Sequence, residues 1–350
     1  MKKISLLLVI AMMISLLAGC AGTPVVYYPD CTCPTASTPD QGNTQPSDPA
    51  TGEIKTGLYI GANVSKSVDG KAEYDVTLAA VTVDENGVIL SCRLDSIGTS
   101  LAFEGGIIST DLTAPILSKN ELGDDYNMVA YGGAVAEWYQ QAQAVADFAV
   151  GKTVEEFRSG AIDETGYAAD ADLATSATIY LGGYVSAIEN AVANAKPLGA
   201  QAGDELRLVA ISTFSSSTAP ADGKDGNAEL DVDVVALTMN GDTITSCYID
   251  AVQAKVAFNA QGVITSDVSA PVLSKNELGD AYNMVAWGGA TFEWYQQAEN
   301  FSAYVTGKTA ADVAGIAIAE STKPAEGTDL AASVTISIFG FQNLIAKAAA

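Results

Sequence analysis

The chain has 350 residues, of which 48% are hydrophobic, so it is long enough for about two domains with packed cores. Acidic residues outnumber basic ones 42 to 17, which gives a formal charge of −25 and argues against nucleic acid as a partner, because such a field repels phosphate backbones. The chain contains no histidine, which excludes a Ser-His-Asp triad, His-based acid–base catalysis and every His-ligated metal site.

The first 19 residues have the pattern of a cleaved leader. Lys2 and Lys3 precede the apolar run ISLLLVIAMMISLL, and the sequence Leu-Ala-Gly-Cys ends at Cys20. The run is too short for a transmembrane helix. The pattern resembles a lipoprotein signal over residues 1–19, which predicts a lipid (palmitate) on Cys20 and a chain anchored in the cell membrane at its extracytoplasmic face. The alternative is a plain secretory signal followed by an incidental cysteine.

Residues 20–53 are rich in Pro, Thr, Ser, Gly, Gln and Asp and show no apolar periodicity. This composition predicts a flexible, disordered tether between the membrane and the folded part of the chain. Cys31 and Cys33 lie within it, where a local or intermolecular disulfide competes with a metal or redox role.

The folded part is predicted to begin with strands. Residues 55–63 form the first, and residues 73–83 alternate so that Tyr74, Val76, Leu78 and Ala80 share one face. The dipeptide Asn-Gly at 86–87 predicts a tight hairpin turn into the next strand. Residues 230–239, a turn at 240–242 and residues 243–252 repeat this pattern. Cys92 and Cys247 are expected late in their strands as buried free thiols.

Helical patterns follow the strands in each half. A helix is expected from about 133 to 149, with its equivalent after residue 289, and Gly151 and Gly307 end these helices. A short helical segment, an apolar β-like segment and a last helix at 183–195 or 340–349 come next. The fold class is therefore α+β: two tandem repeats, at 54–197 and 204–350, each a mainly antiparallel sheet with packed helices.

One stretch shows the duplication directly. Residues 114–153 and 270–309 align without a gap, and 27 of the 40 pairs are identical. Such similarity indicates one module in two copies. The identities include the polar run SKNELGD, which a solvated loop would not be expected to keep. Recent duplication and a shared site both explain it.

A hydroxyl-rich segment precedes the last helix of each half. It reads DLATSATI from Asp172, with Thr175, Ser176, Ala177 and Thr178, and DLAASVTI from Asp329, with Thr335. Hydroxyl groups and free N–H groups at a helix start could hold a phosphate. Ordinary N-capping explains a single Ser or Thr there equally well.

The order of these motifs resembles the FMN-binding domain family, in particular the tandem-domain, pheromone-type lipoproteins of extracellular electron transfer. The residues concerned are GLYIGA, the Asn-Gly hairpin, SKNELGxxYNM, EWYQQA…GKT and the closing DxxTSATI. The resemblance implies that a flavin transferase joins FMN through a phosphoester to the last threonine of D-x-x-[ST]-G-A-[ST], here Thr178. It also implies a membrane redox donor as partner.

The motif departs from the family pattern in both halves. Ser176 stands in place of the glycine, which restricts close approach of a phosphate to the backbone. In the second half only Asp329 and Thr335 match. The resemblance further implies that the flavin ring packs on aromatic residues near the duplicated loop, for which the candidates are Tyr126/Tyr282, Trp138/Trp294 and Tyr131/Trp287. Core packing explains each of these as well.

Two functions therefore compete at the level of sequence. The first is a membrane-tethered flavoprotein that carries electrons from a membrane donor to external acceptors, in which FMN supplies the chemistry. The second is a non-flavin binding or scaffolding lipoprotein with the same tandem fold. Lys119 and Lys275 could neutralise a flavin phosphate, or could form surface ion pairs with Glu121 and Glu277. Both functions make the chain an electron carrier or a binding protein more than a catalyst.

Overall fold

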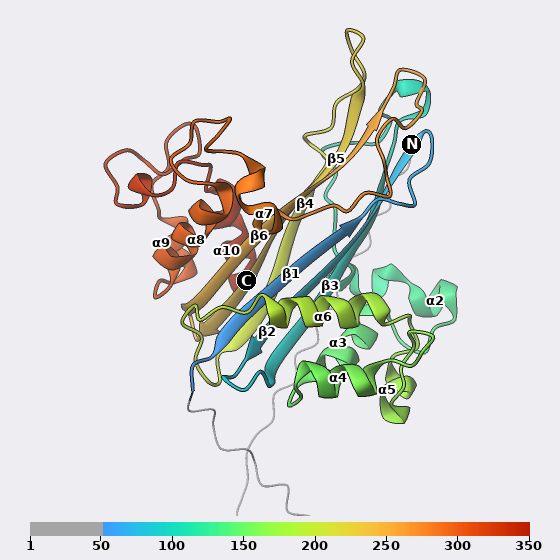
Figure 1. Ribbon diagram of the computed structural model, residues 1–350, viewed down its shortest axis with the longest axis vertical. Helices are drawn as coiled ribbons and strands as arrows, with labels where there is room; N and C mark the ends of the chain where they lie inside the picture. Colours follow the sequence, from blue (N-terminus) through green and yellow to red (C-terminus); the bar gives the residue numbers. More distant parts are fainter. Residues whose placement is uncertain (1–51) are drawn as a thin grey trace, which may run out of the picture. The chain divides into compact units, whose positions relative to one another are not determined.

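Six long strands form two separate three-stranded antiparallel sheets in the computed structural model, which describes residues 52–350 (Figure 1). The first sheet has the order β1-β2-β3 and the second the order β4-β5-β6. The strands are β1 (Lys55–Asn63), β2 (Lys71–Val83), β3 (Ile89–Ala102), β4 (Glu205–Thr213), β5 (Gly226–Asn240) and β6 (Thr243–Phe258). The mixed architecture with antiparallel sheets agrees with the class expected from the sequence.

The alternation of side chains in β2 explains how the first sheet is buried. Tyr74, Val76, Leu78 and Ala80 share one face, as predicted, and are almost fully buried. Ala79, Val81 and Val83 lie on the opposite face of β2 and are also apolar and buried. A strand covered on both faces reads as a continuous apolar run, and that is the pattern at residues 78–81, before the buried Thr82.

The predicted hairpin turns are present in both halves. Gly87 has φ 79° between β2 and β3, and Gly241 has φ 57° between β5 and β6. Both angles lie in the left-handed region that glycine adopts without steric cost. The register of each hairpin is fixed by these turns, with Thr82 opposite Ser91 and Thr238 opposite Ser246.

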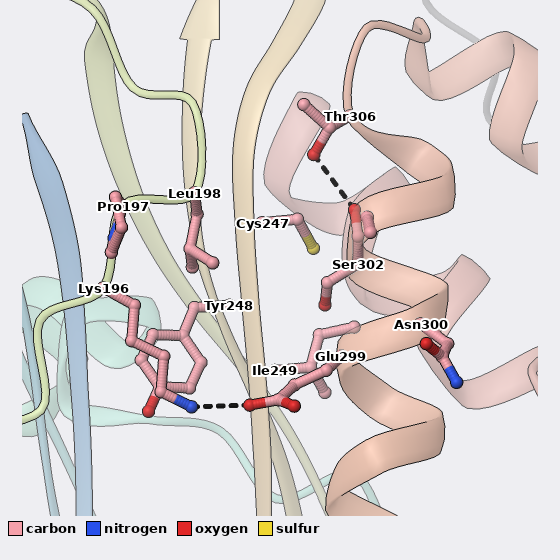
Figure 2. A pocket seen from close by; sticks show the side chains of 11 residues that line it. Lys196, Pro197, Leu198, Cys247, Tyr248, Ile249, Glu299, Asn300, Ser302 and Thr306 are labelled. Atoms are coloured by element: carbon pink, nitrogen blue, oxygen red, sulfur yellow. Dashed lines mark hydrogen bonds and ion pairs between the residues drawn. The ribbon is translucent and has the colours of Figure 1, made fainter. Parts of the chain in front are cut away.

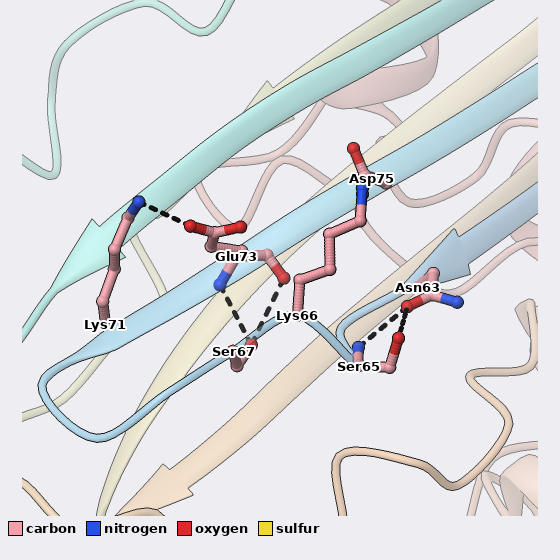
Figure 3. A network of polar contacts seen from close by, with 7 residues as sticks. All are labelled: Asn63, Ser65, Lys66, Ser67, Lys71, Glu73 and Asp75. Carbon is pink, nitrogen blue, oxygen red and sulfur yellow. Dashed lines mark hydrogen bonds and ion pairs between the residues drawn. The ribbon is translucent and has the colours of Figure 1, made fainter.

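A polar network fixes the connection between β1 and β2 (Figure 3). The hydroxyl of Ser67 accepts a hydrogen bond from the backbone N–H of Glu73 at 3.0 Å and donates to its carbonyl oxygen at 3.3 Å. Ser217 and Glu229 repeat this reciprocal pair in the second half at 3.1 and 2.9 Å. The connection is therefore closed by the same pair of hydrogen bonds in both halves.

Helices follow each sheet in matching order. The first half has α1 (Lys119–Leu122), η2 (Gly123–Tyr126), α2 (Met128–Gly132), α3 (Trp138–Ala149), α4 (Val154–Ala161), α5 (Ala171–Ser176) and α6 (Gly182–Ala193), with η1 (Glu104–Gly106) directly after β3. The second half has α7 (Lys275–Leu278), η3 (Gly279–Tyr282), α8 (Trp294–Val305), α9 (Ala310–Ala314), η4 (Leu330–Ala332) and α10 (Phe339–Ala349).

Three apolar clusters hold these layers together. The central cluster lies between the two sheets and takes side chains from both of them. A second cluster joins the outer face of the first sheet to α3, α4 and α6, and a third joins the outer face of the second sheet to α8, α9 and α10 (Figure 1). The order of layers is helices, sheet, sheet, helices, so the two halves share one core.

The two halves contact each other reciprocally where β3 and β6 end. The rings of Phe103 and Phe258 stack with centroids 4.0 Å apart. Beside them, a Cβ at Gly106 would lie 2.6 Å from the carbonyl oxygen of Ala260, and a Cβ at Gly262 would lie 2.9 Å from that of Phe103. Because both glycines also have positive φ, no other residue fits this crossing without strain.

Three local predictions differ from the structure. The helix expected from 133 begins at Trp138, because Glu137 and Gln140 form a capping box there. The apolar β-like segment before the last helix contains only isolated bridges, Ile162 to Ala168 and Ile318 to Pro324. Cys92 and Cys247 are buried free thiols as expected, but they lie near the beginning of β3 and β6, which run on to residues 102 and 258.

Candidate functional site

The polar run SKNELGD is a capped helical turn docked on the sheet, not a free loop. Ser118 and Glu121 form a capping box at the start of α1. Asn120 binds the neighbouring strand twice, with its backbone N–H to Asp95 at 3.1 Å and its amide to the carbonyl of Leu94 at 2.8 Å. Asn276 makes the same pair of contacts in the second half at 3.1 and 3.0 Å. These contacts give a structural reason for most of the duplicated polar residues.

The two carboxylates that accept hydrogen bonds from Asn120 and Asn276 are buried. Asp95 and Asp250 are less than a tenth exposed. Burial raises the pKa of Asp250 to about 6, although hydrogen bonds from Ser274 and from the backbone of Asn276 and Ala251 oppose the shift. Burial also raises the pKa of Asp95 above its ordinary value. In the sequence, these two residues are distinguished only by their equivalent places after the repeated cysteines.

Glu137 and Glu293 bind the segment that precedes the main helix of each half, which is α3 in the first half and α8 in the second. The carboxylate of Glu137 accepts hydrogen bonds from the backbone N–H groups of Met128 and Val129 at 2.8 and 3.0 Å, and Glu293 repeats the two contacts at the same distances. These segments carry the most exposed aromatic residues of the region, Tyr131 in α2 and Trp287 at the equivalent place, each 89% exposed. Both rings are therefore free to contact a ligand or a partner.

The other aromatic candidates are placed differently. Trp138 and Trp294 are buried core residues, and the indole N–H of Trp138 donates to the Tyr184 hydroxyl at 3.0 Å. The ammonium group of Lys275 lies 4.8 Å from the ring centroid of Trp294 and 5.5 Å from that of Tyr282. These three residues form a cation–π cluster beside the sheet.

The same cluster recurs in the first half, where Lys119 lies 5.2 Å from the ring centroids of both Tyr126 and Trp138. Neither lysine has a carboxylate within ion-pair distance among the described residues, so the expected pairs with Glu121 and Glu277 are not formed. Glu121 instead pairs with Lys347 at 2.5 Å. Burial lowers the pKa of Lys275, which the nearby Asp233 carboxylate opposes.

The hydroxyl-rich segment does not begin the last helix of the first half. Asp172, Thr175 and Ser176 lie within α5, a separate short helix that Asp170 caps through the backbone N–H groups of residues 172 and 173. The hydroxyl of Thr175 donates to the carbonyl oxygen of Asp172 at 2.7 Å. Helix α6 begins only at Gly182, with no side-chain cap. The expected phosphate cradle at the start of the last helix is therefore wrong in this form.

Thr178 is hydrogen-bonded to Gln141, a residue that the sequence did not single out as part of the site. The side-chain oxygen of Gln141, on α3, accepts hydrogen bonds from the backbone N–H of Thr178 at 2.8 Å, from its hydroxyl at 3.2 Å and from the backbone N–H of Ile179 at 3.2 Å. Gln141 is fully buried, whereas Thr178 is exposed and its neighbour Ala177 is buried. Thr178 is therefore an exposed residue whose hydroxyl is held in one position by a buried side chain.

The second half repeats this anchor despite its divergent sequence. The side-chain oxygen of Gln297 accepts from the backbone N–H of Thr335 at 2.7 Å, from its hydroxyl at 3.2 Å and from Ile336 at 3.1 Å. Thr335 is exposed, and Asp329 directly precedes the short helix η4. Gln141 and Gln297 are identical in the 40-residue repeat, which is the signal that could have identified them.

An open cleft adjoins the hydroxyl segment of the first half. It has a volume of about 930 Å³ and lies between α3 and α5, with Thr175 and Ser176 on one side and Tyr139 on the other. Asn120, Val135 and Asp147 also contribute to its wall. The cleft thus brings together Thr175 and Ser176 of the hydroxyl segment, Asn120 of the SKNELGD turn and the ring of Tyr139, whereas Thr178 is not among its lining residues. No lysine or arginine is among the described residues that line it.

Several predicted features lie outside residues 52–350. These are the leader at 1–19, the lipidation site at Cys20, the greater part of the tether, and Cys31 and Cys33. Among the described residues, no helix is both long enough and apolar enough to cross a membrane. The same residues contain no group of three carboxylate or thiol side chains placed to bind a metal.

Comparison with known proteins adds no relative from which a role could be transferred. No protein-family model, no curated protein and no solved structure matches the chain.

Proposed function

We propose that the protein is a membrane-tethered, extracytoplasmic lipoprotein of the FMN-binding type that carries electrons from a membrane donor to external acceptors. The observation that carries this proposal is the exposed residue Thr178, whose hydroxyl is held by Gln141 and which lies two residues after Ser176 in the wall of an open cleft. A threonine sealed under apolar neighbours would have argued against it. Attachment to the bilayer through Cys20 belongs to the same proposal.

The residues around the cleft are compatible with FMN. A volume of about 930 Å³ lies at the upper end of the range of small-molecule sites. Thr178 would accept the phosphoester, the carboxamide of Gln141 would orient its hydroxyl, and Tyr139 would present an aromatic face to the ring system. FMN, when bound, supplies the electron-transfer chemistry. Thr335 and Gln297 offer the same anchor in the second half.

A second function is favoured by the charge of the cleft. Its described lining contains the carboxylate of Asp147 and no cation, and Ser176 stands where the flavin attachment motif has glycine. A phosphate is bound most readily where cations or several free N–H groups face it. These observations support a binding or scaffolding lipoprotein whose cleft takes a neutral ligand instead of a flavin.

One experiment separates the two functions. The full-length chain is co-expressed with a bacterial flavin transferase, and the purified protein is tested for in-gel flavin fluorescence and for a mass increase on the peptide that contains residue 178. The matched variants are Thr178→Val, Thr335→Val and the double variant. Because both threonines are exposed, each substitution is expected to change the free energy of unfolding by less than about 1 kcal/mol.

The electron-carrier function predicts fluorescence in the wild type and its loss in Thr178→Val, with any remaining label mapped to Thr335. Label that persists in the double variant would place attachment elsewhere in the chain. An unlabelled wild type that also retains no free FMN would leave the binding-module function as the better account.

A further inference from the structure

Each half of the molecule presents one aromatic ring to solvent on a short turn. Tyr131 lies in α2, and Trp287 lies at the equivalent place of the second half. The two aromatic turns, residues 127–133 and 283–289, have the same backbone. In both, the N–H of the aromatic residue donates to the carbonyl of the asparagine four positions earlier at 3.1 Å, and that asparagine has φ 62°. The two rings are therefore presented in the same way.

The fold does not account for these rings. Each is 89% exposed, so it adds little to the core, and a small polar residue would serve the turn as well. A neighbouring exposed position differs in type between the copies, with Asp125 in the first and Ala281 in the second. The exchange of Tyr131 for Trp287 instead keeps a large ring. Tyrosine and tryptophan are enriched at the centres of protein interfaces, so an external partner explains their presence.

Further exposed apolar residues lie next to the rings in the chain. Val129 and Val285 lie two positions before the ring and are 45% and 43% exposed. In the first half Val135 is 64% exposed and also lines the open cleft, so the aromatic turn of that half borders the cleft. Exposed apolar residues that gather in one segment indicate an interaction surface, whereas scattered single ones do not.

The charged groups nearest to the aromatic turns in the chain are exposed carboxylates without a counter-charge. Asp124, Asp125 and Asp280 have no lysine or arginine within ion-pair distance among the described residues. The cavity between α8, β6 and the segment that links the halves is different, because Lys196 and Glu299 form an ion pair at 2.6 Å there (Figure 2). The aromatic turns therefore combine an apolar surface with uncompensated negative charge.

This charge selects the kind of partner. Residues 118–137 contain one lysine and four carboxylates, and residues 274–293 contain one lysine and three. The lysines, Lys119 and Lys275, lie over aromatic rings of their own half. A chain with charge −25 repels a second copy of itself, an anionic lipid surface and nucleic acid. A basic protein surface is attracted instead, and complementary charge raises the rate of its association.

We propose that the two aromatic turns are docking sites for a basic segment of a partner protein, in which apolar side chains lie among lysines or arginines. The exposed ring packs on an apolar side chain or on a cationic group of the partner, and the neighbouring carboxylates attract its charges. One chain therefore binds two such segments. The proposal does not depend on flavin attachment or on electron transfer.

The test is a calorimetric titration of the purified full-length chain with a short, acetylated and amidated peptide that has two lysines for each leucine. We expect two sites per chain and at least about tenfold weaker binding when sodium chloride is raised from about 20 to about 300 mM. Two comparison peptides carry glutamate in place of lysine or glycine in place of leucine, and both should bind at least about tenfold more weakly. Equal binding of either comparison peptide would overturn the proposal.

Matched variants separate docking at these turns from general attraction to an acidic protein. Tyr131→Ser and Trp287→Ser should each remove one of the two sites, and the double variant should weaken peptide binding at least about tenfold. Ile107→Ser is the control, because Ile107 is 71% exposed and lies outside both turns, and its affinity should stay within about twofold of the wild type. None of these substitutions changes the net charge. Wild-type affinity in the double variant, or an equal loss in Ile107→Ser, contradicts the assignment.

Discussion

The carboxamide oxygen of Gln141 accepts a hydrogen bond from the backbone N–H of Thr178 at 2.8 Å, across 37 positions of the chain. Gln297 and Thr335 repeat the contact at 2.7 Å. A buried glutamine on the main helix therefore determines where the threonine segment lies in each half. The identity of that glutamine in both copies follows from this structural role, whether or not a flavin is attached.

Replacement of Gln141 by leucine should destabilise the protein by about 3 kcal/mol, because two backbone N–H groups lose their acceptor in a partly buried setting. Urea unfolding of the variant measures the loss. Gln297→Leu is the matched substitution in the second half and should give a similar value. A loss below about 1 kcal/mol in both variants would show that the anchor contributes little to stability.

The stability of the protein should carry a pH dependence that originates at Asp250. Its pKa in the folded protein is about 6, above the ordinary value of 3.8, so the folded state holds more protons between these two values. Stability from this residue is therefore present at low pH and is lost as the pH rises through about 6. A shift of this size corresponds to roughly 3 kcal/mol.

The Asp250→Asn variant removes this titration and is compared with the wild type by urea unfolding between pH 4 and pH 8. The stability of the variant relative to the wild type should increase toward higher pH. Asp95→Asn, at the equivalent position of the first half, should change in the same direction, because burial also raises the pKa of Asp95. Parallel pH profiles for wild type and Asp250→Asn would contradict the assignment.

The stacked rings of Phe103 and Phe258 should be among the most sensitive positions in the chain. Both side chains are fully buried, and replacement of either by alanine should cost about 3–5 kcal/mol. Because the rings contact each other at 4.0 Å, the double variant should lose less than the sum of the two single losses, by about 1 kcal/mol. Strict additivity would indicate that the two rings pack independently.

The first half should not be a stable monomer when it is expressed alone. In the full chain the inner face of its sheet is covered by the sheet of the second half, and residues 52–200 without that cover would expose the apolar side chains of β2. We expect this fragment to form a dimer or larger assemblies, which size-exclusion chromatography with light scattering detects. Val76→Asp in the same fragment should prevent dimer formation, and a monomeric, cooperatively folded wild-type fragment would refute the expectation.

The sequence was sufficient for elements whose signals are local. The alternation of Tyr74, Val76, Leu78 and Ala80 predicts the face that they share, and the Asn-Gly pair predicts the turn at Gly87. The internal repeat supports the same element order in both halves. These features depend on side-chain periodicity and backbone preference, which a single sequence contains.

Features that depend on distant contacts could not be predicted in the same way. The approach of Gly106 to Ala260 joins positions more than 150 residues apart, and no local pattern indicates it. The common role of Ser and Thr as helix caps predicts the hydroxyl segment at the start of the last helix. Its actual position in α5 is decided by Asp170, which caps that short helix, and by Gln141, which anchors Thr178 from another element.

The three tryptophans differ so much in exposure that the intrinsic fluorescence of the protein can report on one region of its surface. Trp138 and Trp294 are 2% and 5% exposed, whereas Trp287 is 89% exposed. A neutral quencher such as acrylamide should therefore reach the Trp287 indole first, and the quenched fraction of the emission reports on the exposed loop of the second half. Any molecule that covers this loop becomes visible through protection of that fluorescence, without a label.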